Sequence, residues 1–196
     1  MSIQDTYLFT EGNFDADLVQ KILPDEINAK IKIVSAEGYS NLLSKARSLL
    51  IHKPESKIIL VLDADVSSDE EVNEKISFIQ TYLSVVAAAD RFEVFLQVPE
   101  IESIFLEDKD LAEEIVRTYA LNPDFKGTDF KLSDLEFEFA KEKPKKSLER
   151  LLGGERNLRA LIESDLSEEF VIKIRKLDFP QKLIKYIEQL SLDTAA

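Results

Sequence analysis

Four short apolar segments recur along the first hundred residues, each bounded by charged or turn-forming residues. They lie at 6–10, 31–35, 57–63 and 92–98. The third segment, KIILVLD, carries an unbroken apolar run from Ile58 to Leu62 and begins with β-branched residues. Such a run is too short to span a membrane and is typical of a strand that is buried on both faces of a parallel sheet. All four segments are predicted to be strands.

Amphipathic segments separate these strands. Apolar residues recur at helical spacing at 14–23, 42–51 and 70–88, and Pro24 is expected to end the first helix. Strands that alternate with helical crossovers predict an α/β domain with a mainly parallel four-stranded sheet flanked by helices, a Rossmann-like arrangement. We assign residues 1–108 to this domain.

The pattern changes after Ser103, and residues 109–196 are predicted to form a mostly helical extension that packs on the first domain. Helices are expected at 104–119, 147–152, 157–163 and 179–192. The stretch 122–146 has the composition of a loop, with one short strand near 135–139, and Gly153-Gly154 indicates a helix stop.

Composition restricts the chemistry. The chain of 196 residues has no cysteine and a single histidine, His52, which excludes disulfides, thiolate metal sites and histidine-rich zinc sites. A metal would have to be held by oxygen atoms, which favours Mg²⁺, Mn²⁺ or Ca²⁺. No apolar stretch has the length of a bilayer span and no secretory signal is visible, so we expect a cytoplasmic protein without membrane association.

The formal net charge is −13. Nucleic-acid affinity comes mainly from contacts with phosphates, so this charge argues against tight binding of nucleic acid without metal. It argues less strongly against a metal-dependent nuclease, because the acids of such a site are neutralised by cations.

Carboxylates follow three of the predicted strands. Glu11 follows the first, Asp63 and Asp65 end the third, and Glu100 and Glu102 follow the fourth. The carboxyl ends of parallel strands meet at one edge, where ligands of open α/β sheets bind. Gathered carboxylates raise each other's pKa values, and a divalent cation removes that cost.

Each acid also has a simpler interpretation. Asp63 and Asp65 could cap a turn or the following helix, Glu100 and Glu102 could begin a helix after Pro99, and Glu11 could be an exposed acid before a turn. The spacing of the residues alone leaves both interpretations open.

Residues 5–106 resemble the TOPRIM domain of topoisomerases, bacterial primases and overcoming-lysogenization-defect (OLD) nucleases. Glu11-Gly12 after the first strand and Asp63-Ala64-Asp65 after the third carry the resemblance. Two segments are similar to the OLD branch in particular, EGNFD at 11–15 and PEIESIF at 99–105. A chain of this kind without a Walker motif would be a stand-alone TOPRIM protein. The third-strand motif lacks the glycine that follows it in topoisomerases, which argues against strand passage.

The resemblance implies a metal site and a catalytic lysine. Glu11, Asp63 and Asp65 would bind one Mg²⁺ or Mn²⁺ ion, and Glu102, with Glu100 as the alternative, would hold a second ion together with Glu11 or Asp15. The lysine would come from the cluster 143–146, where Lys145 is our candidate and Lys143 and Lys146 are the alternatives. A basic loop that caps a helix explains that cluster equally well.

The function implied is metal-dependent cleavage of DNA or RNA, in phage defence or nucleic-acid processing, with an ATPase as a separate protein partner. A non-catalytic module is the alternative: it would bind metal or a protein and act as the partner of an ATPase in a defence system. A receiver-like phospho-acceptor domain also places acids at strand ends, but the order of its elements fits this chain poorly.

Overall fold

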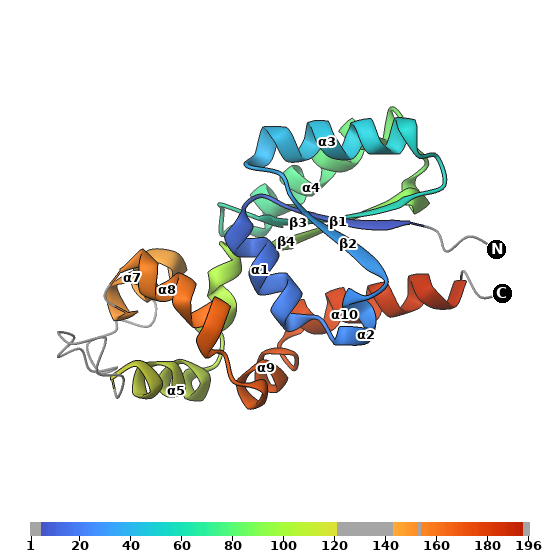
Figure 1. The fold of residues 1–196 in the computed structure, drawn as a ribbon. Helices are drawn as coiled ribbons and strands as arrows, with labels where there is room; N and C mark the ends of the chain where they lie inside the picture. The colour runs from blue at the N-terminus through green and yellow to red at the C-terminus, as the bar shows by residue number, and fades with distance from the viewer. Residues whose placement is uncertain (1–4, 121–142, 153, 194–196) are drawn as a thin grey trace.

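The computed structural model describes residues 5–120, 143–152 and 154–193. Its sheet contains β1 (Thr6–Thr10), β2 (Ile31–Ser35), β3 (Lys57–Asp63) and β4 (Phe92–Gln97). All pairings are parallel, in the order β2-β1-β3-β4. The predicted α/β class and parallel four-stranded sheet are confirmed, and the carboxyl ends of the strands share one edge (Figure 1).

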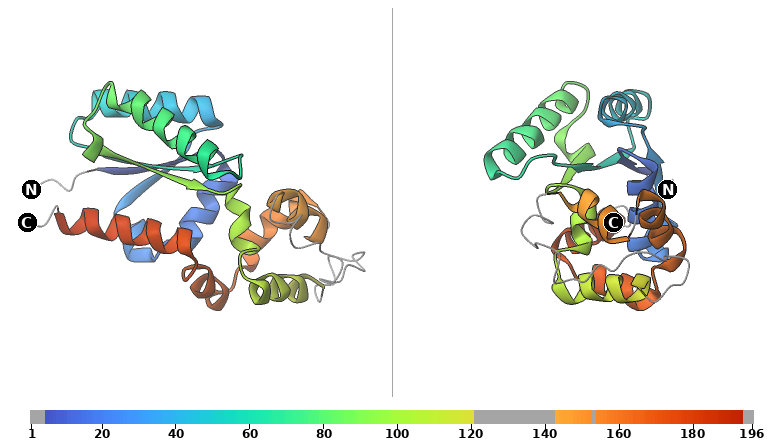
Figure 2. Two further views of the ribbon diagram at one scale, coloured as in Figure 1. Left: turned by 180° about the vertical axis from the view of Figure 1, so that it is seen from behind. Right: turned by 90° about the vertical axis from the view of Figure 1, so that its left-hand side faces the viewer.

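Helices cover both faces of the sheet. On one face lie α3 (Tyr39–His52) and α4 (Asp69–Ser84), as Figure 1 shows and the views in Figure 2 confirm. On the other face lie α1 (Asn13–Ile22), the short α2 (Asp25–Asn28) and the C-terminal α10 (Asp178–Asp193). Helices near the two ends of the chain therefore cover the same face.

The central strand β3 divides its side chains between two hydrophobic cores. Ile58, Leu60 and Leu62 pack with residues of α3 and α4, whereas Ile59 and Val61 pack with residues of α1 and the C-terminal helices. All five side chains are buried. This alternation explains the unbroken apolar run, because each face of the strand meets a separate helical layer.

The C-terminal region is helical, as expected. Figure 1 shows α5 (Lys109–Ala120), α7 (Pro144–Leu152) and α8 (Glu155–Ala160) beyond the carboxyl edge of the sheet, with α9 (Glu168–Ile174) next to them. A π-helical turn, Leu161–Asp165, follows α8. The core under β3 contains residues from both halves of the chain, and Phe95 of β4 contacts the rings of Phe179 and Tyr186 in α10.

Some elements differ from the expectation. The helix expected from residue 104 begins at Lys109 instead. The Asp108 carboxylate caps its start by accepting the backbone N–H of Leu111 at 2.9 Å. The residues before it, Ile101–Phe105, form the 3-10 turn η2. The helix expected over 70–88 ends at Ser84. α2 and α9 were not expected, and the strand expected near 135–139 falls outside the described residues.

Within the part of the chain that is described, no helix is both long and apolar enough to cross a membrane. The boundary expected at residue 108 stays a prediction.

Candidate functional site

Four carboxyl groups from four separate segments gather at the carboxyl edge of the sheet. Glu11 follows β1, Asp15 lies in the first turn of α1, Asp63 ends β3 and Glu102 lies in η2. Burial raises the pKa of each, and for Glu11, Asp63 and Glu102 the charge of a neighbouring carboxylate of the group raises it further. Sequence spacing predicted that the acids after the strands would meet at this edge, and Glu11, Asp63 and Glu102 do; Asp15, which only the resemblance indicated, lies with them.

Asp63 shows the strongest perturbation. Burial is the largest cause, and the charges of Asp15, Glu102 and Glu11 add to it, which together raise the pKa of Asp63 from 3.8 to about 8. One hydrogen bond opposes the shift, since Oδ1 of Asp63 accepts the backbone N–H of Ile101 at 2.7 Å. At neutral pH and without a cation, the Asp63 carboxyl group is therefore mostly protonated.

Glu102 is held by a lysine from the C-terminal region. Its side chain is almost completely buried, and Oε1 lies 3.4 Å from Nζ of Lys145, the second residue of α7. Burial raises the pKa of Glu102, and the ammonium group of Lys145 opposes that shift. The backbone N–H of Lys145 also donates to Oε2 of Glu100 at 3.1 Å. Lys145, our candidate among the three lysines, therefore lies against the acidic group.

Glu100 therefore has a local structural partner outside the group of four. Asp15 has a structural role as well: its Oδ2 accepts the backbone N–H of Gly12 at 2.8 Å, across the first turn of α1. Its carboxylate both caps α1 and lies near Asp63, so a capping role and a place in the acidic group are compatible in one residue.

Glu11 carries an unsatisfied oxygen. Its Oε1 is buried and has no hydrogen-bond partner. Burial raises the pKa of Glu11, and the charge of Lys75 opposes the increase. A buried carboxylate oxygen without a partner is costly, and a bound cation is one group that would satisfy it.

Two residues near Asp65 were not identified from the sequence. Lys75 of α4 donates through Nζ to the backbone oxygens of Asp63 and Ala64 at 2.7 and 3.1 Å, and to Oδ2 of Asp65 at 3.0 Å. The same ammonium group lies 5.1 Å from the centre of the Tyr39 ring. A signal for Lys75 was present, because helical spacing places it on the apolar face of α4 between Val72 and Ile79. Tyr39 had no such signal.

The donor set fits an oxygen-preferring cation, but it is not preassembled. Within residues 5–120, 143–152 and 154–193, no group of three or more aspartate, glutamate or histidine side chains is arranged to hold a metal ion. The side chain of Asp65 is 64% exposed and paired with Lys75. Holding an ion between Glu11, Asp63 and Asp65 would therefore require side chains of this set to move closer together.

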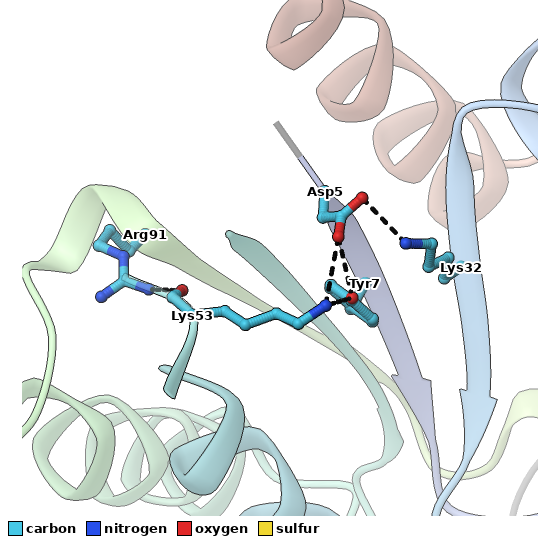
Figure 3. Close-up of polar contacts among 5 residues, drawn as sticks. All are labelled: Asp5, Tyr7, Lys32, Lys53 and Arg91. Atoms are coloured by element: carbon cyan, nitrogen blue, oxygen red, sulfur yellow. Dashed lines mark hydrogen bonds and ion pairs between the residues drawn. The ribbon is translucent and has the colours of Figure 1, made fainter. Parts of the chain in front are cut away.

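The opposite edge of the sheet provides a contrast. There, Asp5 pairs with Lys32 at 2.9 Å and with Lys53 at 3.3 Å, and both ammonium groups lie near the Tyr7 ring (Figure 3). These cations lower the pKa of Asp5. Arg91 donates to the backbone oxygen of Lys53 at 2.8 Å. The carboxylate at this edge is matched by cations, whereas acids outnumber lysines at the carboxyl edge.

A groove of about 940 Å³ lies elsewhere, between the end of α1 and the segment 162–175. Asp17 lines this groove, and none of the four clustered acids does. Asp17 lies on α1 after its first turn and outside the acidic group.

No protein-family model and no curated protein matches the chain. The resemblance to the TOPRIM domain therefore depends on the residues Glu11, Gly12, Asp63 and Asp65 and on their arrangement.

Proposed function

We propose that the protein is a divalent-metal-dependent nuclease, which cleaves phosphodiester bonds of DNA or RNA at the carboxyl edge of the sheet. One observation carries the proposal: four carboxyl groups from separate segments gather at one edge with raised pKa values, and one oxygen of Glu11 is buried without a partner. Folding collects these charges at a cost, and a cation that binds them offsets it.

The carboxylates would serve as ligands of two metal ions. Glu11, Asp63 and Asp65 would hold one Mg²⁺ or Mn²⁺ ion, and Glu102 with Asp15 would hold a second. When bound, such an ion lowers the pKa of a coordinated water and neutralises charge that develops on the phosphate.

Two further properties of the site matter for this chemistry, namely the protonation of Asp63 and the positive charge of Lys145. Asp63 must release its proton before it can bind a cation, because its pKa is about 8 in the metal-free protein. Lys145, whose side chain is 47% exposed beside Glu102, offers positive charge to a phosphate group at the mouth of the site. The OLD-like segments extend the proposal to phage defence in the cytoplasm, with a separate ATPase as a partner.

Cleavage assays test this function. Supercoiled plasmid, single-stranded DNA and RNA oligonucleotides are incubated with the protein in Mn²⁺, in Mg²⁺ and in EDTA. We expect cleavage by the wild type that requires a divalent ion and is lost in Asp63→Asn. Asp17→Asn is the matched control, because Asp17 lies on α1 outside the acidic group. Equal activity of wild type and Asp63→Asn would exclude this site as the catalytic centre.

A non-catalytic module remains the second candidate, and one observation favours it. In the described part of the chain no ready set of metal ligands is present, while Lys75 and Lys145 already pair with Asp65 and Glu102. Calorimetric titration discriminates between the two functions. Absence of binding at millimolar Mg²⁺ and Mn²⁺ would favour an interaction module that presents its acidic surface to a basic partner.

A further inference from the structure

Lys75 fastens the turn that follows β3. Its Nζ contacts three oxygens within 3.1 Å, namely the backbone oxygens of Asp63 and Ala64 and Oδ2 of Asp65. An ammonium group has three N–H donors, so these contacts occupy all of them. The side chain is only 19% exposed. Lys75 therefore has no donor left for a substrate phosphate, and its effect on the site must act through this turn.

The turn holds Asp65 in an unusual conformation. Its φ angle is +58°, in the left-handed region that few non-glycine residues adopt, and its backbone N–H donates to the backbone oxygen of Pro99 at 2.8 Å. With the backbone fixed on one side and Oδ2 held by Lys75, the orientation of the carboxylate is determined. Oδ1 of Asp65 is the oxygen that Lys75 does not hold.

We propose that Lys75 is a positioning residue of the cation site: it fixes the turn after β3 and holds one carboxylate oxygen of Asp65, which leaves the other for a divalent cation. This inference rests on the proposed function, since it assigns a role toward the same ion. Partners that hold the second atom of a metal ligand are common at metal sites and set the direction of the ligand.

The alternative is a competing role, in which the ammonium group of Lys75 takes the place of the cation beside Asp65. The contacts favour positioning, because two of the three partners of Lys75 are backbone oxygens of the turn, which are not the carboxylate oxygens that a cation would take. The Tyr39 ring beside the ammonium group further restricts its movement.

The chain offers a closely matched control in Lys57. Nζ of Lys57 donates to a backbone oxygen and to a carboxylate oxygen of Asp90, at 2.6 and 3.1 Å, and its side chain is 18% exposed. Lys57 begins β3 and therefore lies at the other end of the same strand. Lys57→Met removes comparable contacts and the same charge without touching the acidic edge.

The test measures binding directly. Mn²⁺ affinity is determined by calorimetry, and Tb³⁺, which takes oxygen ligands, reports the location of the ion through emission sensitised by Tyr39. We expect Lys75→Met to weaken Mn²⁺ binding by about 10- to 100-fold, and Lys57→Met to leave it unchanged. Lys75→Arg keeps the charge and should recover part of the affinity. Tyr39→Phe should remove the sensitised emission.

A double variant separates positioning from a general effect on folding. If Lys75 acts through Asp65, Lys75→Met should have little further effect on Mn²⁺ affinity in an Asp65→Asn background. Circular dichroism and thermal unfolding verify the fold of each variant, and Lys75→Gln replaces Lys75→Met if the latter does not fold.

Four results would overturn the inference. Tighter Mn²⁺ binding by Lys75→Met would assign Lys75 the competing role, and either unchanged binding or equal weakening by Lys75→Met and Lys57→Met would reduce it to a structural contact. In these cases the wild type still binds the ion, and the proposed function stands. Absence of Mn²⁺ and Tb³⁺ binding by the wild type would overturn the cation site and the role of Lys75 together.

Discussion

Asp63 and Ile101 are joined by a hydrogen bond of 2.7 Å, from the backbone N–H of Ile101 to Oδ1 of the carboxylate. The backbone N–H of Ala64 continues the pairing of β3 with β4 by donating to the oxygen of Gln97 at 2.8 Å. The ends of the two strands are thereby fastened together, and Glu102, the residue after Ile101, is brought beside Asp63. The acidic group is thus a consequence of sheet pairing that extends past the strands.

The raised pKa of Asp63 predicts how the stability of the metal-free protein depends on pH. Asp63 has a pKa of about 8 in the folded chain against 3.8 for an ordinary aspartate, so the folded state binds more protons than the unfolded state between these values. This contribution to stability is complete below the lower value and is lost as the pH rises through the higher one. Glu11, Asp15 and Glu102 shift in the same direction.

We therefore expect the free energy of unfolding in EDTA to fall by on the order of 3 kcal/mol between about pH 5 and about pH 8. Urea denaturation at a series of pH values measures it. Asp63→Asn, which cannot ionise, should flatten the decrease and be more stable than the wild type at the upper end. A flat profile for the wild type would contradict the assigned burial of Asp63.

Divalent ions should reverse this dependence. A bound cation requires ionised carboxylates, so Mn²⁺ should raise the midpoint of thermal unfolding more at about pH 8 than at about pH 6. At a concentration near 100 times the dissociation constant the gain is about 2.7 kcal/mol. Differential scanning calorimetry of wild type and Asp63→Asn measures it, with Asp17→Asn as control. An Mn²⁺ effect of the same size in Asp63→Asn would place the ion elsewhere.

The strands of the sheet could be predicted because β3 and its neighbours carry local signals. The apolar run Ile58 to Leu62 and the stop at Pro24 are properties of adjacent residues. The gathering of Glu11 and Asp63 followed from one rule about parallel strands. These features required no knowledge of contacts that are distant in sequence.

The parts that were missed depend on contacts between distant residues. Lys75 lies on a buried helix face, but only the turn after β3 gives it partners there. Which lysine of the cluster 143–146 reaches Glu102 depends on where α7 begins, and Pro144 in the first helical position places Lys145 against the acids. Asp108 begins α5 through a single cap that the periodic pattern did not reveal.

The ion pair between Lys145 and Glu102 should contribute to stability as well as to the site. Lys145→Met leaves the buried Glu102 carboxylate without its ammonium partner. The pKa of Glu102 should then rise further, because the charge of Lys145 lowers that pKa in the wild type. We expect a loss of about 1–2 kcal/mol in the free energy of unfolding near neutral pH, reduced from the value for a fully buried pair because Lys145 is half exposed. In a Glu102→Gln background, Lys145→Met should lower the free energy of unfolding much less.

Lys146→Met is the control for that pair, since Lys146 is the exposed neighbour on the same turn of α7. Urea denaturation of the single variants and of the double variant gives the coupling energy. A coupling energy near zero would mean that the contact of 3.4 Å is not maintained in solution.

The C-terminal region is tied to the sheet domain at the end of α1, and this tie predicts a long-range effect. Arg175, the residue after α9, donates through Nε to the backbone oxygen of Ile22 at 2.6 Å and through Nη2 to that of Leu23 at 3.1 Å. Both oxygens lie at the end of α1 and lose this partner when the guanidinium group is removed, although the side-chain amide of Asn28 still donates to the oxygen of Leu23 at 3.1 Å. Arg175→Met should lower the free energy of unfolding by about 1–2 kcal/mol.

Arg159→Met is the matched control, because Arg159 pairs only with an exposed glutamate one helical turn away, Glu155, and such pairs contribute about 0.3–0.5 kcal/mol. Hydrogen exchange should show faster exchange at the end of α1 and in α9 for Arg175→Met, and unchanged exchange in β3. If both arginine variants lose the same stability, the contact between the two halves of the chain would be no stronger than a surface ion pair. The shared hydrophobic core beneath β3 would then be the main contact that holds the two halves together.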